Sequence, residues 1–298
     1  MIHIAQLKPK TAQGQGGLYL ALSAMSFLVM SVFVKFLDHI PVQELVVFRS
    51  LVSIVICIFF IRRKKRSPWG VRKKMLVLRG VLGSMAMFLL FVSLHLIPLA
   101  TTTVLVQTAP IFTLLIGIPL LHEKPIPIQW VFFSGAIVGV VLVKGFDQTA
   151  PWTHYLPAFG SAMIAGVAHN LVRELRKTEH AQVIIFYLAL TSLSIFFPWA
   201  AYTWVWPTQT EWLFVLSLGL FMQLGQYLMT RAYATAPMAA ILHFSYVGVV
   251  AATIIGYVFF AETLPWLEMV GIFMIISCMY LANRVAKLQP TFEEPKVG

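Results

Sequence analysis

The stretches IPLATTTVLVQTAPIFTLLIGIPLLHE (residues 97–123) and APMAAILHFSYVGVVAATIIGYVFFAE (residues 236–262) follow one pattern. Each passes from a proline, through an apolar segment of membrane length, to a glutamate. Pro98 and Pro237 are 139 residues apart, as are Glu123 and Glu262 (237 − 98 and 262 − 123), so the copies align without a gap. A membrane-length unit that occurs twice is typical of transporters built from two related halves around a shared site.

The composition excludes a soluble protein. Of the 298 residues, 59% are hydrophobic and 11% charged, whereas soluble domains contain roughly 25% charged residues. Several stretches exceed the ~20 apolar residues that cross a bilayer. The net charge of +11 does not indicate nucleic acid binding, because the basic residues lie between apolar stretches. The segment RRKKRSPWGVRKK (residues 62–74) is typical of a cytoplasmic loop that touches anionic lipid headgroups.

We predict an all-α integral membrane protein with ten transmembrane helices arranged as two inverted five-helix repeats. The predicted spans are Gly16–Phe36, Val42–Ile61, Met75–Ile97, Leu99–Leu121, Ile128–Lys144, Tyr155–Leu171, Ala181–Trp204, Glu211–Thr230, Met238–Phe260 and Trp266–Arg284. An odd number of spans per half makes the two halves cross the membrane in opposite directions. We expect the first repeat in residues 1–150, the second in residues 151–286, and a polar tail in residues 287–298.

The positions of lysine and arginine predict the orientation. With both termini in the cytoplasm, nearly all basic residues fall in cytoplasmic segments, including a basic loop that is taken to extend to Arg79. Only Lys35, Arg49 and Lys144 fall elsewhere. No cleavable signal peptide is evident at the N-terminus. We therefore expect a bacterial cytoplasmic (inner) membrane protein with both termini cytoplasmic.

A family resemblance rests on FRSLVS in the second span (residues 48–53), LRG at the start of the third (residues 78–80) and both proline-to-glutamate units. In these stretches, and over nearly its whole length, the chain resembles ten-span members of the EamA group of the drug/metabolite transporter superfamily. The resemblance implies a carrier of metabolites or amino acids without a prosthetic group. It also implies a central cavity framed by the third, fourth, eighth and ninth spans.

Arg49 is the sharpest candidate for a binding residue. It lies about 12 Å along the second span if that helix starts at Pro41, and a charge at this depth needs an anion, carbonyl groups or water. Arginine is suited to binding a carboxylate or phosphate on a substrate. Alternatively, Arg49 has a structural role, either reaching the outer interface or bonding carbonyl groups of a neighbouring helix.

The repeat selects a second set of candidates. At the 139-residue offset, Gln107 in the fourth span corresponds to Tyr246 in the ninth, and equivalent polar positions should face the same centre. His243 lies one helical step from Tyr246 on the same face. We expect all three to line the cavity, with hydrogen bonding between helices as the competing interpretation.

The eighth span adds Gln223, Gln226 and Tyr227, whose polar groups need water or partners within a membrane. Three further positions have an expected packing or hinge role. Gly80 and Gly83 permit close approach of helices, and Pro110 can kink the fourth span.

Several chemistries find no support in the sequence. All eleven acidic residues lie at or near loops and span ends, so no central carboxylate is available as a proton or Na⁺ relay. Cys57 and Cys278 fall inside predicted helices, which excludes a disulfide framework. We expect no metal site, cofactor or catalytic residue, and therefore not an enzyme.

The sequence favours a secondary carrier of a small polar metabolite, such as an amino acid or a related anion-bearing compound, that works by alternating access. A multidrug or cationic-compound exporter and a non-carrier channel or scaffold remain alternatives. The expected partners are a small-molecule substrate and the lipid bilayer, in a monomer or homodimer.

Overall fold

The computed structural model describes residues 12–65, 67–109, 111–113, 116, 131–132, 134–135, 138–139, 142, 151–236, 241–262 and 265–286, without the side chains of residues 243, 268, 279 and 282–286. All regular elements in these residues are helices. They are α1 (Ala12–Phe36), α2 (Val42–Arg63), α3 (Lys73–Leu96), α4 (Leu99–Val106), η2 (Trp152–His154), α7 (Leu156–Leu175), α8 (Ala181–Ala200), α9 (Gln209–Thr235), η3 (Leu242–Tyr246), α11 (Val247–Phe260) and α12 (Trp266–Ala286).

Among the described helices, α1, α2, α3, α8 and α9 are long and apolar enough to cross a membrane. Shorter apolar helical stretches occur at Leu99–Thr113, Phe244–Phe260 and Met269–Cys278. The starts of helices follow local signals. Pro41 and Pro98 directly precede α2 and α4, where a residue without an N–H loses no helical hydrogen bond. Thr208 and Glu211 form a capping box at the start of α9.

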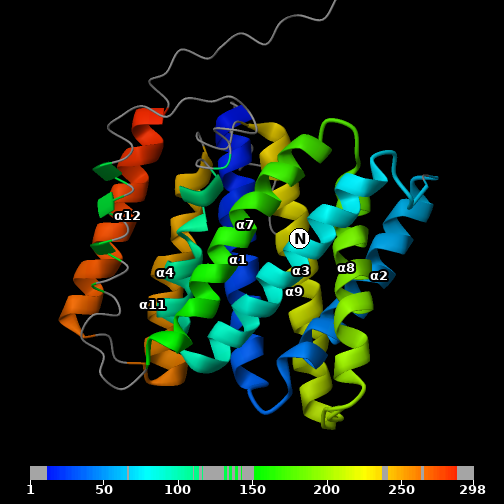
Figure 1. Ribbon diagram of the computed structural model, residues 1–298, viewed down its shortest axis with the longest axis horizontal. Coiled ribbons are helices and arrows are strands. Elements are labelled where there is room, and N and C mark those ends of the chain that lie inside the picture. Colours follow the sequence, from blue (N-terminus) through cyan, green and yellow to red (C-terminus); the bar gives the residue numbers. More distant parts are fainter. Residues whose placement is uncertain are drawn as a thin grey trace, which may run out of the picture.

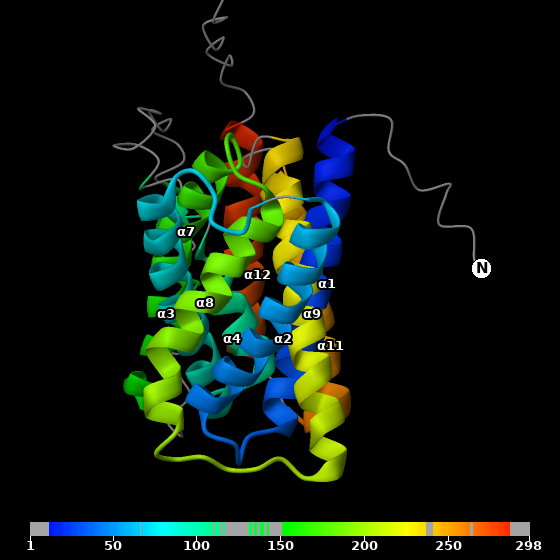
Figure 2. The same cartoon turned by 90° about the vertical axis from the view of Figure 1, so that its right-hand side faces the viewer.

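The helices run lengthwise through one bundle (Figures 1 and 2). The start of α1, the end of α12 and the turn between α2 and α3 lie at the same end. In Figure 1, α1 and α3 run downward while α7 and α9 run upward, and α4 runs upward while α11 runs downward. The most extensive helix pairs are α1 with α9, α2 with α8, α3 with α7, α3 with α8 and α2 with α9, and α4 packs against α11.

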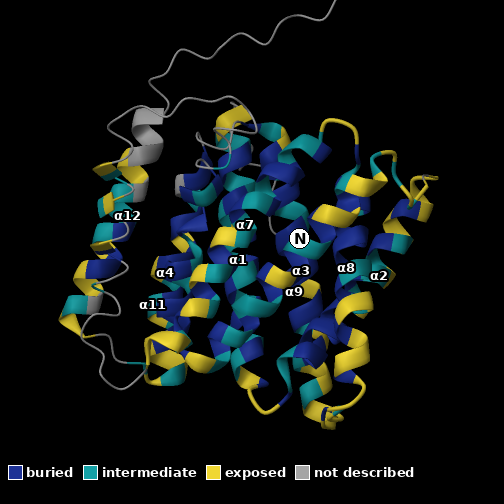
Figure 3. Ribbon diagram, in the orientation of Figure 1, coloured by how far each residue is buried: buried dark blue, intermediate teal, exposed yellow. Residues whose placement is uncertain are grey.

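Close packing of these pairs depends on small residues. A side chain added at Gly17 would collide with the ring of Phe244, and one at Gly225 would collide with the ring of Phe27. Both contacts bring α1 against the second half of the chain, where glycine allows the helices to approach closely. Buried residues follow the inward sides of the helices, and exposed residues gather on outward faces and at the ends (Figure 3).

Buried carboxylates hold the ends of the bundle together. Glu44, fully buried at the start of α2, accepts hydrogen bonds from the backbone N–H of Val205 (2.8 Å) and the hydroxyl of Thr203 (3.2 Å). Glu262, after α11, accepts from the ammonium of Lys35 (2.7 Å) and from the backbone N–H of Leu99 (2.8 Å) at the start of α4. Each carboxylate ties helices that are distant in the sequence.

The bounds of α1, α2, α3, α7, α8, α9 and α12 agree with the predicted spans to within about five residues. The predicted fourth and ninth spans are described only in part, as α4 and as η3 with α11. Most of the predicted fifth span, the loop after Leu121, the start of the ninth span and the C-terminal tail lie outside the described residues. Two local interruptions were not predicted. The α-helical hydrogen bonding of α4 gives way to a turn at Gln107 and Thr108, and α11 is preceded by the 3₁₀ turn η3.

Candidate functional site

Arg49 is buried in the middle of the bundle, with a relative exposure of 1%. It lies seven residues into α2, about 10 Å from the start of that helix. Its Nη2 donates to the hydroxyl of Ser192 on α8 (2.7 Å). Nε has no hydrogen-bond partner among the described residues, and no described carboxylate forms a salt bridge with this guanidinium.

The hydroxyl of Ser192 also contacts the hydroxyl of Ser84 on α3 (2.6 Å). Each serine is eleven residues from the start of its helix, or about 17 Å along the axis, which is half the thickness of a hydrocarbon core. The side chain of Arg49 therefore ends near the predicted centre of the membrane. It does not reach the membrane interface, so a structural role in which Arg49 extends to the outer interface does not apply.

Arg79 was counted with the cytoplasmic basic residues, although it falls within the predicted third span, Met75–Ile97; the structure places it inside the helix. It lies inside α3 with a relative exposure of 2%, and its Nη2 donates to Oε1 of Gln226 on α9 (3.2 Å). Its Nε and Nη1 have no partner among the described residues. Because Arg79 follows a run of basic residues, the charge pattern does not distinguish it from the arginines of the loop. Two features of the sequence could have indicated that it is buried: six helical residues precede it, and glycines lie one and four positions after it.

The two predicted packing glycines flank this arginine. A side chain added at Gly83 would meet Nη1 of Arg79, so the guanidinium occupies the space that this glycine leaves. A side chain added at Gly80 would meet Thr191 and the backbone of Tyr187, both on α8. The absence of side chains at these positions permits both the burial of Arg79 and the close contact of α3 with α8. Pro110, the predicted hinge, lies outside the described residues.

Gln107 and Tyr246 lie in the contact between α4 and η3, on the other side of the bundle. Nε2 of Gln107 donates to the carbonyl oxygen of Ser245 (3.0 Å), and the hydroxyl of Ser245 donates to Oε1 of Gln107 (3.3 Å). Tyr246 is 6% exposed and packs in an apolar cluster with Val104 and Val249, and its hydroxyl has no partner in the described part of the chain. The contact is of the helix-to-helix kind, at the point where both helices are interrupted.

The remaining candidates separate. Gln223 donates through Nε2 to Oε1 of Gln182 on α8 (3.1 Å) and to Sγ of Cys57 on α2 (3.3 Å). The hydroxyl of Tyr227 accepts from Arg231 (3.1 Å), toward the end of α9. The side chain of His243 is outside the described part of the structure. Gln226 thus joins the arginines, whereas Gln223 and Tyr227 lie in other polar contacts.

His169 is not among the candidate residues selected from the sequence. Its Nδ1 is buried without a partner among the described residues, and its ring lies 5.5 Å from that of Tyr233, centroid to centroid. The charge of Arg79 acts on both of these residues and on Arg49. Arg49, Arg79, Ser84, Ser192 and Gln226, here called the arginine cluster, include three buried guanidinium nitrogens that have no partner among the described residues.

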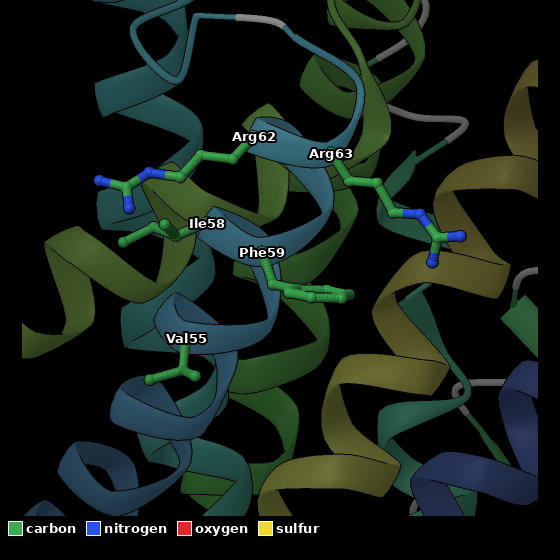
Figure 4. Close-up of a pocket in the computed structure, with 5 residues that line it drawn as sticks. All are labelled: Val55, Ile58, Phe59, Arg62 and Arg63. Atoms are coloured by element: carbon green, nitrogen blue, oxygen red, sulfur yellow. The ribbon is translucent and has the colours of Figure 1, made fainter.

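The hollow drawn in Figure 4 is a different feature. It lies on the surface, at the end of α2, where Val55, Ile58 and Phe59 line it and Arg62 and Arg63 point to opposite sides. None of its residues belongs to the arginine cluster. Within the described ranges, no group of three or more metal-ligating side chains occurs.

This arrangement can bind an anion by donating hydrogen bonds, because guanidinium groups only donate and serine hydroxyls can do either. The described cluster contains no nucleophile paired with a base and offers no set of metal ligands. Its chemistry is that of recognition.

Three relatives with transporter names align with this chain. The pseudopaline exporter CntI of Pseudomonas aeruginosa is 26% identical, over 90% of this chain and 96% of its own. Solute carrier family 35 member G1 of Homo sapiens is 28% identical, over 97% and 83%. An S-adenosylmethionine uptake transporter of Rickettsia bellii is 28% identical, over 70% and 72%.

A solved crystal structure has the same fold, with a TM-score of 0.68 and 18% identity, over 93% of this chain and 97% of the other. The profile of the EamA-like transporter family matches the chain twice, over residues 14–145 and 152–284. These two matches together cover nearly the whole sequence. The chain therefore belongs to the EamA-like transporter family and is a membrane transporter.

Proposed function

We propose that this protein is a secondary carrier of a small polar metabolite that bears an anionic group, such as an amino acid or a related compound. It works by alternating access between two inverted five-helix repeats, residues 1–150 and 151–286. The observation that carries the proposal is Arg49, a buried cation at the middle of the bundle whose described partner is a neutral serine. A charge kept at such a depth is explained by a ligand that it binds.

The helix pairs support the inverted arrangement of ten spans. If α1, α2, α3 and α4 correspond to α7, α8, α9 and α11, then each described counterpart runs opposite to its partner (Figure 1). Exchanging the halves converts the α1–α9 pair into the α7–α3 pair, and both are major contacts. In the α2–α8 pair and in the α4–α11 pair, the two helices are each other's counterparts, so the exchange leaves each pair unchanged. A two-fold axis in the membrane plane would pass through these last two contacts.

Both central polar contacts lie on those two self-paired interfaces. Arg49 bonds Ser192 across α2 and α8, and Gln107 bonds Ser245 across α4 and η3. Interrupted helices at equivalent positions of two halves are a recurrent feature of transporter sites, because they leave backbone groups available to a substrate. The first contact supports a central site at the arginine cluster, and the second lies on the other side of the bundle. We keep Gln107, Tyr246, Gln223, Tyr227 and His243 as proposed members of the site.

We place the protein in a bacterial cytoplasmic membrane with both termini cytoplasmic. The start of α1 and the end of α12 lie at the same end of the bundle as the basic turn after α2 (Figures 1 and 2), in agreement with the distribution of lysine and arginine. Labelling single cysteines placed at residue 64 and at residue 206 with an impermeant reagent tests this. Label should reach position 206, but not 64, in intact cells.

Counterflow in proteoliposomes tests the carrier mechanism, because a carrier accelerates uptake of label when it is loaded with unlabelled substrate and a channel does not. A thermal-shift screen of amino acids, carboxylates, nucleotides and cationic drugs selects the compound. Arg49→Ala should reduce counterflow of an anionic compound at least about tenfold, since a charge-assisted hydrogen bond is lost. Arg62→Ala, which removes an exposed arginine from the same helix, is the matched control. Counterflow by no compound in the screen would reject the proposal.

A further inference from the structure

Two guanidinium groups converge on the centre of the bundle from opposite ends. Arg49 starts about 10 Å from the beginning of α2, and Arg79 starts about 9 Å from the beginning of α3, which runs the other way. The guanidinium of Arg79 lies over Gly83, one turn farther along α3. Ser84, the next residue in the chain, contacts Ser192, which accepts from Arg49. The contacts of Arg49 therefore reach the part of α3 over which the guanidinium of Arg79 lies.

The positive charges of these arginines are not compensated by the described protein. The described acceptors are one serine hydroxyl for Arg49 and one amide oxygen for Arg79, although each guanidinium has five N–H donors. Three of their nitrogen atoms are buried without a partner in the described part of the chain: Nε of Arg49, and Nε and Nη1 of Arg79. No carboxylate in the described residues forms an ion pair with either group, and the sequence contains none in the middle of a predicted span.

A structural role would look different. Two charged groups in structural contacts of the described bundle illustrate the difference, because each has an opposite charge or several backbone partners. Lys35 pairs with Glu262, and Glu179 accepts from the backbone N–H groups of Val71 (2.6 Å) and Arg72 (2.7 Å). Among the described residues, Arg49 and Arg79 have neither kind of partner. A buried charge without a compensating partner is costly, and a ligand of opposite charge would remove that cost for both arginines.

We propose that Arg49 and Arg79 bind one small organic dianion between them, with one negative charge meeting each guanidinium. Ser84, Ser192 and Gln226 position the two cations, and Gly83 leaves the room that Arg79 needs. The substrate class is thus a dicarboxylate or a phosphate monoester, in preference to a compound with one negative charge. The inference rests on the proposed carrier function and narrows it.

A size-matched ligand series tests the charge requirement on the purified wild-type protein. Succinate, succinamate and succinamide carry two, one and no negative charges on nearly the same frame. Malonate, glutarate, adipate and glycerol 3-phosphate extend the search over other dianions. Thermal stabilisation at constant ionic strength is measured for each compound. We expect at least one dianion to bind about tenfold or more tightly than its monoanionic counterpart, a ratio that one charge-assisted hydrogen bond accounts for. The absence of this preference in every dianion overturns the inference.

Variants then test whether both arginines meet the same ligand. Arg49→Gln and Arg79→Gln should each reduce the preference for the dianion to about twofold, and the double variant should be no worse than either single one. Arg79→Lys, which keeps the charge, should retain part of the preference. Arg63→Gln is the control, because that exposed arginine leaves the buried pair intact. An undiminished preference in Arg79→Gln overturns the assignment of Arg79.

The ligand-free variants distinguish binding from a structural role. Removing one of two unpaired like charges should leave the melting temperature unchanged or raise it, whereas loss of a structural contact should lower it. If Arg79→Gln does not fold, Arg79→Lys and the wild-type series still decide the question. Counterflow separates the two proposals. Exchange of a neutral or cationic compound without dianion binding rejects only this inference, whereas dianion binding without any exchange rejects the carrier function.

Discussion

The tie at Glu262 allows a quantitative test of how the two halves of this transporter are held together. Its carboxylate accepts from Lys35 of α1 (2.7 Å) and from the N–H groups of Leu99 (2.8 Å) and Ala100 (3.4 Å) at the start of α4. The side chains of Lys35 and Glu262 are 17% and 8% exposed, so water screens the pair only in part. Each short charge-assisted bond contributes roughly 1.5–3 kcal/mol, and the positive end of a helix adds up to about 1 kcal/mol.

Because these terms do not add fully, we expect Glu262→Ala to destabilise the protein by about 3–4 kcal/mol. That corresponds to a melting temperature lower by about 6–8 °C, at roughly 2 °C per kcal/mol for a chain of this length. Glu262→Gln keeps an acceptor for one N–H group and should lose about half as much. Thermal unfolding of the purified protein in one detergent measures both.

A double-mutant cycle with Lys35→Met isolates the ion pair, for which we expect a coupling energy of about 1–2 kcal/mol. Asp38→Asn near the same end of the bundle is the control, because its side chain is 77% exposed and should shift stability by less than about 0.5 kcal/mol. Strict additivity of the Glu262 and Lys35 substitutions would refute the reasoning. So would a Glu262→Ala variant as stable as the control.

Three smaller predictions follow. Gly83→Ala should weaken binding of anionic ligands several-fold in a titration, because the added methyl group displaces the guanidinium of Arg79; unchanged affinity would mean that the guanidinium has room elsewhere. Glu44→Ala should lower the free energy of unfolding by about 1–2 kcal/mol, since the N–H of Val205 and the hydroxyl of Thr203 lose the acceptor that Glu44 provides; a wild-type melting curve would contradict this. Tyr246→Phe should leave the stability of the ligand-free protein unchanged or higher, because the hydroxyl is buried without a described partner, while changing the apparent affinity for substrate; wild-type transport kinetics would remove Tyr246 from the site.

The helices were predictable because hydropathy and proline positions act locally. A bilayer requires long apolar helices. Pro41 and Pro98 indicate helix starts in the sequence, and α2 and α4 begin directly after them in the structure. The repeat offset also carried three-dimensional information. It paired Gln107 with Tyr246, and the structure joins Gln107 to the neighbouring residue, Ser245. The offset relates positions, however, and does not say which side chain at an interrupted helix turns toward its counterpart.

Arg79 could not be located from charge alone. Its distance from the basic loop is six helical residues, and the pattern of alternating loops assigns every arginine near a cluster to the cytoplasm. The direction of its side chain depends on the space over Gly83 and on Gln226, which is 147 residues away in the chain. Such partners follow from packing between helices, which periodicity within one helix does not describe.

Both cations of the central cluster come from the first half of the chain. At the 139-residue offset their counterparts are Leu188 and Leu218, which carry no charge. If the two halves exchange conformations during transport, the outward-open and inward-open states have different free energies, because only the first half carries the two buried arginines. The substrate-free carrier should therefore populate one of these two states more than the other. A bound anion that neutralises the arginines would reduce this difference in free energy. The carrier would then change state more readily with substrate bound than without it.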